Sequence, residues 1–65
     1  MRVCVVIPAY NEARNLPVLL PRVFAQAEFL PGWELSVLVV DDDSTDGTRA
    51  VLAEMQTRYP ALYVL

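Results

Sequence analysis

The hydrophobic positions along the chain follow two different periods, and each period predicts a different kind of element. Residues 2–7 are almost all apolar, so that odd-numbered and even-numbered side chains both form apolar faces. A strand that is apolar on both sides is typical of a buried parallel sheet. Residues 35–40 repeat this pattern, and residues 62–65 begin a third such run. Because Pro8 has no N–H to donate, we expect it to end the first strand.

Between these strands the apolar positions recur at the spacing of an amphipathic helix. From Leu16 to Leu30 they follow the i, i+3, i+4, i+7 pattern. Asn15 stands where a side chain caps such a helix. The second helical pattern extends from Thr48 to Tyr59, and either Ser44 or Thr45 is placed to cap it.

The order of these elements predicts the fold class. Strand, helix, strand, helix and strand at these lengths imply parallel pairing with right-handed crossovers, which is a parallel βαβαβ unit of the α/β class. If both crossovers step the same way, both helices cover one face of the sheet and the other apolar face stays bare. A stable protein of 65 residues does not leave such a face to water. We therefore expect the rest of a larger domain, or a partner chain, to cover it.

Composition and charge exclude several classes of function. The chain has five basic residues, all arginine, against eight acidic ones, and 55% of it is hydrophobic. This apolar fraction excludes a disordered tail. The net charge of −3 without lysine argues against a nucleic-acid partner and against a polybasic membrane patch. The arginines are expected to form an ordinary solvated surface.

The residue types that are missing narrow the chemistry further. Without histidine, the chain has no imidazole for acid–base catalysis or metal binding. A single cysteine, Cys4, excludes an internal disulfide framework and a zinc site, suits a reducing compartment, and is expected to fill the core. No apolar run approaches the ~20 residues of a membrane-spanning helix.

Two polar clusters follow the first two predicted strands, at the edge where open parallel sheets bind ligands. The first is residues 8–12, Pro-Ala-Tyr-Asn-Glu, and the second begins with three aspartates, residues 41–43. A tyrosine ring can stack on a base, and a carboxylate can accept hydrogen bonds from base N–H or ribose O–H groups. Acids repel phosphates unless a cation intervenes, so these residues suit the base and sugar end of a nucleotide.

Each cluster also has a simpler interpretation. Residues 8–12 can be a capped loop, and the acidic cluster can be a solvated turn with helix-capping carboxylates. We assign Asp43, Ser44 and Asp46 to such a turn. Asp41 and Asp42 are different, because adjacent carboxylates repel each other and cost stability unless something uses them.

Motifs for other nucleotide or metal sites are missing from the chain. No Gly-x-Gly-x-x-Gly follows either strand, and no Walker-type Gly-Lys-Ser/Thr is present. A calcium loop that begins at Asp42 would have Ala53 at its twelfth position, where a bidentate Glu is required. The sequence predicts no metal site.

The two clusters together resemble a known family. Residues 6–12, Val-Ile-Pro-Ala-Tyr-Asn-Glu, with Asn15-Leu16, and then residues 39–48 are similar to the opening of family 2 glycosyltransferases with the GT-A fold. They look most like the subgroup that makes dolichyl- or polyprenyl-phosphate mannose. The resemblance covers essentially the whole chain. It implies that residues 1–65 are the N-terminal, Rossmann-like nucleotide-binding segment of a single, larger domain.

The resemblance implies five residues that bind the nucleotide of a sugar donor: Pro8, Tyr10, Glu12, Val40 and Asp42. Among them, Val40 matches a backbone contact to the base, and Asp42 matches the acid that hydrogen-bonds the base. Asp43 replaces the commoner Gly or Asn of the family. We expect the turn to accept it, since aspartate tolerates left-handed geometry.

The family also implies an activity for the complete protein. It would transfer mannose or another hexose from a GDP- or UDP-sugar to an acceptor such as a polyprenyl or dolichyl phosphate. The reaction would take place on the cytoplasmic side, at the inner face of a membrane. Mg²⁺ or Mn²⁺ would neutralise the leaving diphosphate. The metal-binding Asp-x-Asp and the acceptor-binding residues are expected beyond Leu65, so the segment has no catalytic residue or metal ligand and would be inactive alone.

Two alternatives belong to other classes. Residues 38–43 followed by a helix are also similar to the first strand of a response-regulator receiver domain, in which an acidic pair holds Mg²⁺ beside a phosphoacceptor aspartate. That interpretation leaves the first 34 residues without a role, and we favour the transferase. A third possibility is a βαβ fragment that only binds a nucleotide.

Overall fold

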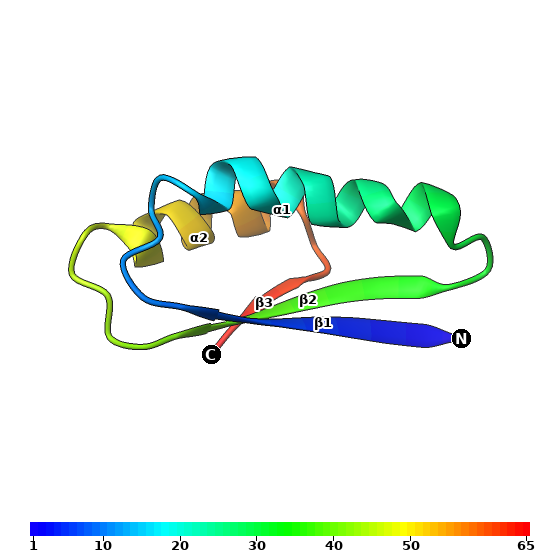
Figure 1. The fold of residues 1–65 in the computed structure, drawn as a ribbon, viewed down its shortest axis with the longest axis horizontal. Helices are drawn as coiled ribbons and strands as arrows, with labels where there is room; N and C mark the ends of the chain where they lie inside the picture. Colours follow the sequence, from blue (N-terminus) through cyan, green and yellow to red (C-terminus); the bar gives the residue numbers. More distant parts are fainter.

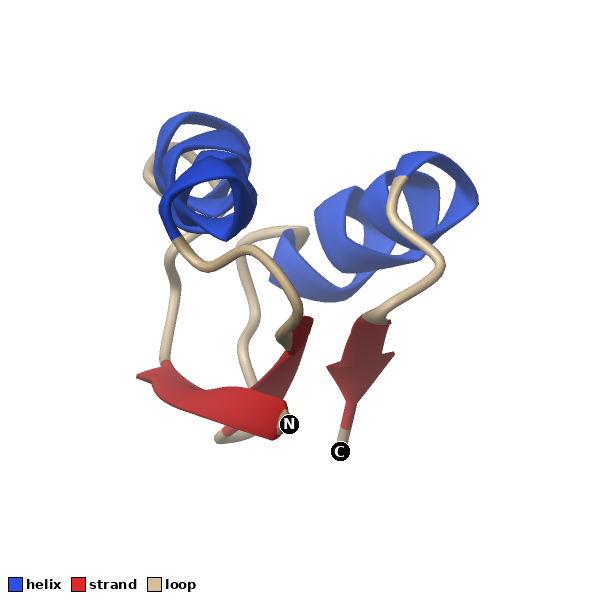
Figure 2. Ribbon diagram, turned by 90° about the vertical axis from the view of Figure 1, so that its right-hand side faces the viewer, coloured by secondary structure: helices blue, strands red, loops and turns tan.

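The computed structural model describes all 65 residues and arranges them in two layers, a sheet with both helices on one of its faces (Figures 1 and 2). The elements in chain order are β1 (Arg2–Ala9), α1 (Leu16–Ala25), the 3-10 helix η1 (Gln26–Phe29), β2 (Glu34–Asp41), α2 (Thr48–Arg58) and β3 (Leu62–Val64). The strand order is β1-β2-β3, and both pairings are parallel. The predicted α/β class and the parallel βαβαβ order are confirmed.

The first strand is longer than the sequence predicted. Pro8 does not end it: β1 continues to Ala9, and Pro8 pairs with Val40 of β2. The carbonyl oxygens of Met1 and Ala9 accept hydrogen bonds from the β2 side, so the backbone groups of odd-numbered residues face β2. Pro8 therefore lacks its N–H on the free edge of the sheet, where no strand needs it. The prediction was wrong because proline is tolerated on an edge strand.

The core lies between the sheet and the helices. Val37 and Val39 of β2 are fully buried on the helix-covered face. Leu16 and Leu20 of α1 and Leu52 of α2 pack against them in a cluster of eight buried hydrophobic residues. The odd-numbered positions of β1 and β2 thus supply one side of the core, as the alternation predicted.

The opposite face of the sheet carries no helix (Figure 2). On that face, 59% of Val6 and 56% of Tyr63 are exposed. Cys4 is exposed as well, so the prediction that it fills the core is wrong. Cys4 occupies an even-numbered position of β1, so it lies on the face that carries no helix. That one apolar face of the sheet stays bare agrees with the expectation from the sequence.

The first helix begins at the predicted residue and ends sooner. Asn15 occupies the N-cap position, but its side chain makes no capping hydrogen bond. Its amide instead donates to Glu12 Oε2 at 2.6 Å. The α-helix ends at Ala25 and the chain continues as η1, so the predicted helix is divided. Neither α-helix has the length and hydropathy that crossing a bilayer requires.

Candidate functional site

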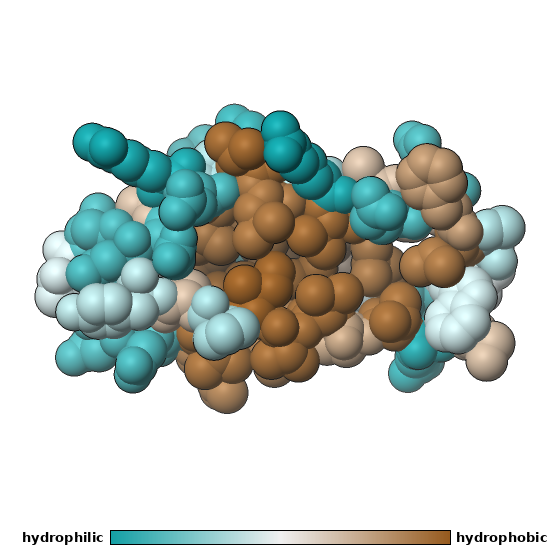
Figure 3. Space-filling view, viewed as in Figure 1, coloured by the Kyte–Doolittle hydropathy of each residue, from teal (hydrophilic) through white to brown (hydrophobic).

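Two loops lie at the carboxyl end of the sheet, residues 10–15 after β1 and residues 42–47 after β2 (Figure 1). Ala9 and Asp41, the last residues of the two strands, are paired. The backbone N–H of Asp42 donates to the Ala9 carbonyl oxygen at 2.8 Å. Hydrophilic side chains gather at this end of the molecule, whereas hydrophobic ones fill its middle (Figure 3). The structure thus brings the two polar clusters together at one rim.

Hydrogen bonds between the loops join them. The N–H of Asn11 donates to Ser44 Oγ at 2.9 Å, and the N–H of Thr45 donates to Asn11 Oδ1 at 2.8 Å. The N–H of Ala13 donates to Asp46 Oδ2 at 3.2 Å. Ser44 and Thr45 therefore do not cap α2, contrary to the prediction, because both are engaged by the first loop. Asn11, with φ 53°, has the left-handed backbone that asparagine tolerates.

A buried threonine completes the connection between the loops. Thr48, the first residue of α2, is fully buried, and its hydroxyl oxygen accepts the N–H of Glu12 at 3.1 Å. That hydroxyl donates in turn to Asp46 Oδ1, which also accepts the N–H of Thr48 at 3.1 Å. The Thr48 hydroxyl, together with these backbone N–H groups, holds the pKa of Asp46 below its usual value. Asp46 thus caps α2 from the position before the N-cap residue, Gly47.

Asp41 has a structural role, and the sequence analysis missed its partner. The side chain of Asp41 is only 3% exposed and accepts hydrogen bonds from Ser44 Oγ and, at 2.9 Å, from Arg49 Nε. These two hydrogen bonds, that of Ser44 first, lower the pKa of Asp41. Arg49 also reaches Asp43 at 3.4 Å. Something does use Asp41, as its position beside Asp42 suggested, but the users are Ser44 and Arg49 of the chain itself. Arg49 is 68% exposed, yet its ion pairs give it a role beyond that of an ordinary solvated surface residue.

A sequence signal for Arg49 did exist. Arg49 lies in the first turn of α2, where the positive end of the helix dipole disfavours a cation. A basic residue at that position, shortly after three aspartates, indicates a local ion pair.

Asp42 is the one member of the aspartate run whose carboxylate has no partner. Its side chain makes no hydrogen bond or ion pair, and the residue is exposed. Asp43 has φ 56°, so the predicted left-handed geometry is confirmed. Tyr10, 59% exposed, follows Ala9 directly at the same rim. Pro8, Tyr10, Val40 and Asp42 therefore lie together where the two strands end.

Glu12, the fifth predicted residue, lies toward the helices. Its carboxylate accepts the Asn15 amide, and its backbone N–H is held by Thr48. With Pro8 it lines a pocket of about 490 Å³ beside α1, which Arg22 also lines. This pocket links two of the five predicted residues.

The acidic residues do not fit a divalent cation. No group of three carboxylate, thiol or imidazole side chains is arranged to hold a metal ion. The carboxylates of Asp41 and Asp46 already bind donors of the chain itself. The acid cluster accordingly suits hydrogen-bond donors better than a metal.

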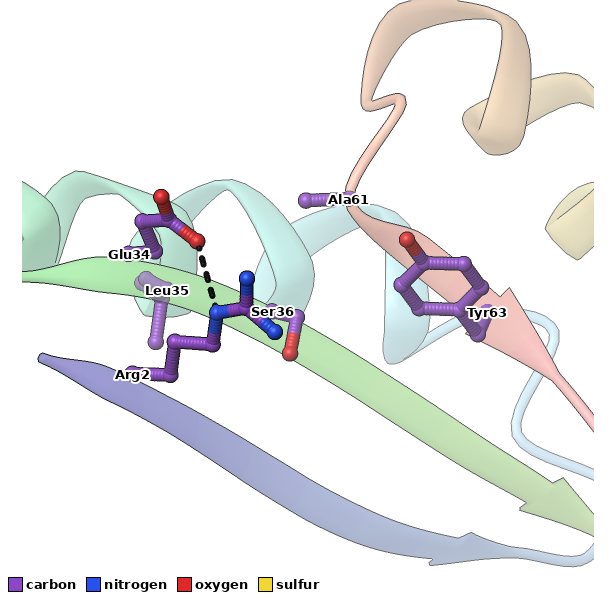
Figure 4. A pocket seen from close by; sticks show the side chains of 6 residues that line it. All are labelled: Arg2, Glu34, Leu35, Ser36, Ala61 and Tyr63. Atoms are coloured by element: carbon purple, nitrogen blue, oxygen red, sulfur yellow. Dashed lines mark ion pairs between the residues drawn. The ribbon is translucent and has the colours of Figure 1, made fainter.

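A second pocket, of about 380 Å³, lies at the other end of the sheet (Figure 4). Arg2 and Glu34 form an ion pair of 3.2 Å beside it, and both side chains are largely exposed. Such exposed pairs contribute little stability. None of the five predicted residues lines this pocket.

Comparisons with known proteins show which family the chain is similar to. A family model described as Glycosyl transferase family 2 matches residues 4–65. The chain is 42% identical over 60 residues to a dolichol-phosphate mannosyltransferase of Pyrococcus furiosus, covering 92% of the chain and 16% of that protein. It is 41% identical over 59 residues to a polyprenol monophosphomannose synthase of Mycolicibacterium smegmatis, covering 91% of the chain and 20% of that protein.

The name of a third relative refers to a different sugar. It is an undecaprenyl-phosphate 4-deoxy-4-formamido-L-arabinose transferase of Enterobacter sp., 43% identical over 53 residues, with 82% of the chain and 16% of that protein covered. The chain thus spans 16% to 20% of the length of these relatives. No solved structure matches the chain.

Proposed function

The chain belongs to glycosyltransferase family 2, and from this we propose that it supplies the nucleotide-binding part of an enzyme that transfers a sugar from a nucleotide-sugar donor. The observation that carries the proposal is the rim formed by two hydrogen-bonded loops. Tyr10 and Asp42, whose carboxylate has no protein partner, directly follow the paired strand ends Ala9 and Asp41 on this rim. The receiver-domain alternative has no support, because the family match includes the first βα unit, for which a receiver has no use.

Within this proposal each residue of the rim has a role that its chemistry allows. The carboxylate of Asp42 accepts hydrogen bonds from the N–H groups of the base, and the ring of Tyr10 stacks on the base. Val40 and Pro8, paired across the strands, form the surface beneath it. Glu12 and Pro8 line the pocket beside α1, which Tyr10, Val40 and Asp42 do not line, so Glu12 would contact a part of the donor away from the base.

We propose GDP or UDP as the nucleotide of the donor, mannose or another hexose as the sugar, and a polyprenyl or dolichyl phosphate as the acceptor. The names of three relatives support this acceptor, since each refers to a dolichol, polyprenol or undecaprenyl compound. Two of the names refer to mannose and one to a modified arabinose. The reaction would take place at the cytoplasmic face of a membrane, and Mg²⁺ or Mn²⁺ would be held by residues outside this segment.

Residues 1–65 would form part of one larger domain whose remaining polypeptide covers the bare face of the sheet. The exposed Val6 and Tyr63 support this, because water contact at such positions is costly. Cys4 tests it: in the complete protein the peptide containing Cys4 should resist alkylation until urea is added. Rapid labelling of Cys4 in the native complete protein would contradict the covering.

Titration of GDP and UDP into the complete protein tests the nucleotide site. Asp42→Ala removes a charged acceptor, whose hydrogen bonds contribute ~1.5–3 kcal/mol, so affinity should fall by about tenfold to a hundredfold. Glu28→Ala is the matched control, since Glu28 is also exposed but lies in η1, away from the rim. Equal affinity of Asp42→Ala and the unmodified protein would contradict the role of Asp42.

A further inference from the structure

Arg49 binds the two aspartates on either side of Asp42. Its Nε lies 2.9 Å from Asp41 Oδ2, and its Nη2 lies 3.4 Å from Asp43 Oδ1. The side chain therefore spans the turn whose middle residue is Asp42. No other arginine of the chain forms ion pairs with two carboxylates.

The position of Arg49 is unfavourable for a cation unless the acids compensate for it. It belongs to the first turn of α2, whose dipole repels positive charge. The attraction of two carboxylates within ion-pair distance outweighs this repulsion by the helix dipole. The planar guanidinium can bind both at once, whereas a lysine ammonium on its flexible stem cannot do so with the same geometry.

These ion pairs affect the free carboxylate of Asp42, which lies between the bound carboxylates of Asp41 and Asp43. Three successive aspartates repel one another, and an unrestrained turn would let their side chains separate. Arg49 neutralises part of this charge, Ser44 holds Asp41 from the other side, and Asp43 is fixed in a left-handed conformation. Only the Asp42 carboxylate then remains without a protein partner.

We propose that Arg49 is a positioning residue, which binds Asp41 and Asp43 so that the turn between them presents the Asp42 carboxylate to the base of the nucleotide. This rests on the proposed function of Asp42. In this role Arg49 acts through the turn, with its Nε and Nη2 directed to the two aspartates, and not by contact with the ligand. It differs in this from an arginine that binds the phosphates directly.

The test uses the complete protein and titrates both the nucleoside diphosphate, GDP or UDP, and the corresponding nucleoside. Arg49→Gln should weaken both by the same factor, about tenfold, since the turn must then be ordered on binding. Arg49→Lys, which keeps the charge without the fork, should lose less. Arg58→Gln is the matched control: Arg58 lies on the same helix, is 67% exposed against 68% for Arg49, and pairs only with Glu54.

A double-variant cycle separates positioning from a general structural role. If Arg49 acts through Asp42, adding Arg49→Gln to Asp42→Ala should weaken binding no further. A role in stability alone would lower the melting temperature and leave the nucleoside affinity of the folded single variant unchanged, which would overturn the inference. If Arg49→Gln does not fold, Arg49→Lys decides, and its full affinity would likewise overturn it.

The remaining outcomes are also distinct. A loss of affinity for the diphosphate but not for the nucleoside would assign Arg49 to the phosphates and overturn the positioning role. If Asp42→Ala binds the nucleotide more weakly but Arg49→Gln binds it as tightly as the unmodified protein, the inference about Arg49 is overturned and the proposed function still stands. Unchanged affinity of Asp42→Ala would overturn the proposed function itself.

Discussion

The hydroxyl of Thr48 should stabilise the rim, and Thr48→Val removes it with little change of shape. The side chain is fully buried, accepts the N–H of Glu12 at 3.1 Å and donates to Asp46. Valine leaves the Glu12 N–H without a partner and deprives Asp46 of one donor. An unsatisfied buried donor costs ~1–3 kcal/mol, so we expect a loss of about 2 kcal/mol. Thr48→Ser keeps the hydroxyl and removes one methyl group, which should cost about 1 kcal/mol.

Native-state hydrogen exchange measures this loss locally in the complete protein. A cost of about 2 kcal/mol corresponds to a protection factor of the Glu12 amide that falls about thirtyfold in Thr48→Val. In Thr48→Ser the same amide should lose only about fivefold. If the Glu12 amide exchanges equally slowly in the valine variant and the unmodified protein, the hydroxyl does not hold the loops together.

Three further predictions concern the same chain. The carboxylates of Asp41 and Asp46 have pKa values below the usual 3.8. The stability that they contribute is therefore present above pH 3.8 and is lost as the pH falls through their lowered pKa values. Amide protection in residues 10–15 and 42–47 should fall over the same pH range, and Asp41→Asn should reduce this acid dependence. Leu52→Ala, at a fully buried site, should cost ~2–5 kcal/mol in urea unfolding, whereas Val18→Ala, at a position 56% exposed, should cost less than about 0.5 kcal/mol. Gly47→Ala should lower the free energy of unfolding by ~1–2 kcal/mol, because φ is 90° at this position. A Cβ there would meet no atom within 4 Å, so the cost comes from the backbone conformation and not from a clash. An unchanged melting temperature in thermal unfolding would contradict this prediction.

Much of the fold was predictable because its signals are local. The switch from β-branched apolar runs to helical spacing identified all three strands and both helices. The Pro8 error shows where such reasoning fails. Whether a missing N–H ends a strand depends on which edge of the sheet that strand occupies, and only the pairing with β2 decides that.

Part of the candidate site could also be predicted from the sequence, and part could not. The motifs in residues 8–12 and 41–43 and their common edge could be read from the chain. Local chemistry did not distinguish Asp41 from Asp42, because both are acids at the end of one strand, and only the family resemblance singled out Asp42. Arg49 and Ser44 bind the first and leave the second free, and these partners come from a helix and a turn that the fold brings back to the strand end.

By itself the sequence determined the succession of elements, the apolar alternation and the acids available at one rim, since each depends on residues close together along the chain. The tertiary structure decided which face of the sheet is bare, so that Cys4 is exposed rather than buried. It also decided which carboxylate remains without a partner. Which face is bare depends on contacts between segments distant in sequence, which local patterns do not encode. Which carboxylate stays free depends on Ser44 and Arg49, which lie near Asp41 in sequence but contact it only once the turn and the start of α2 are folded.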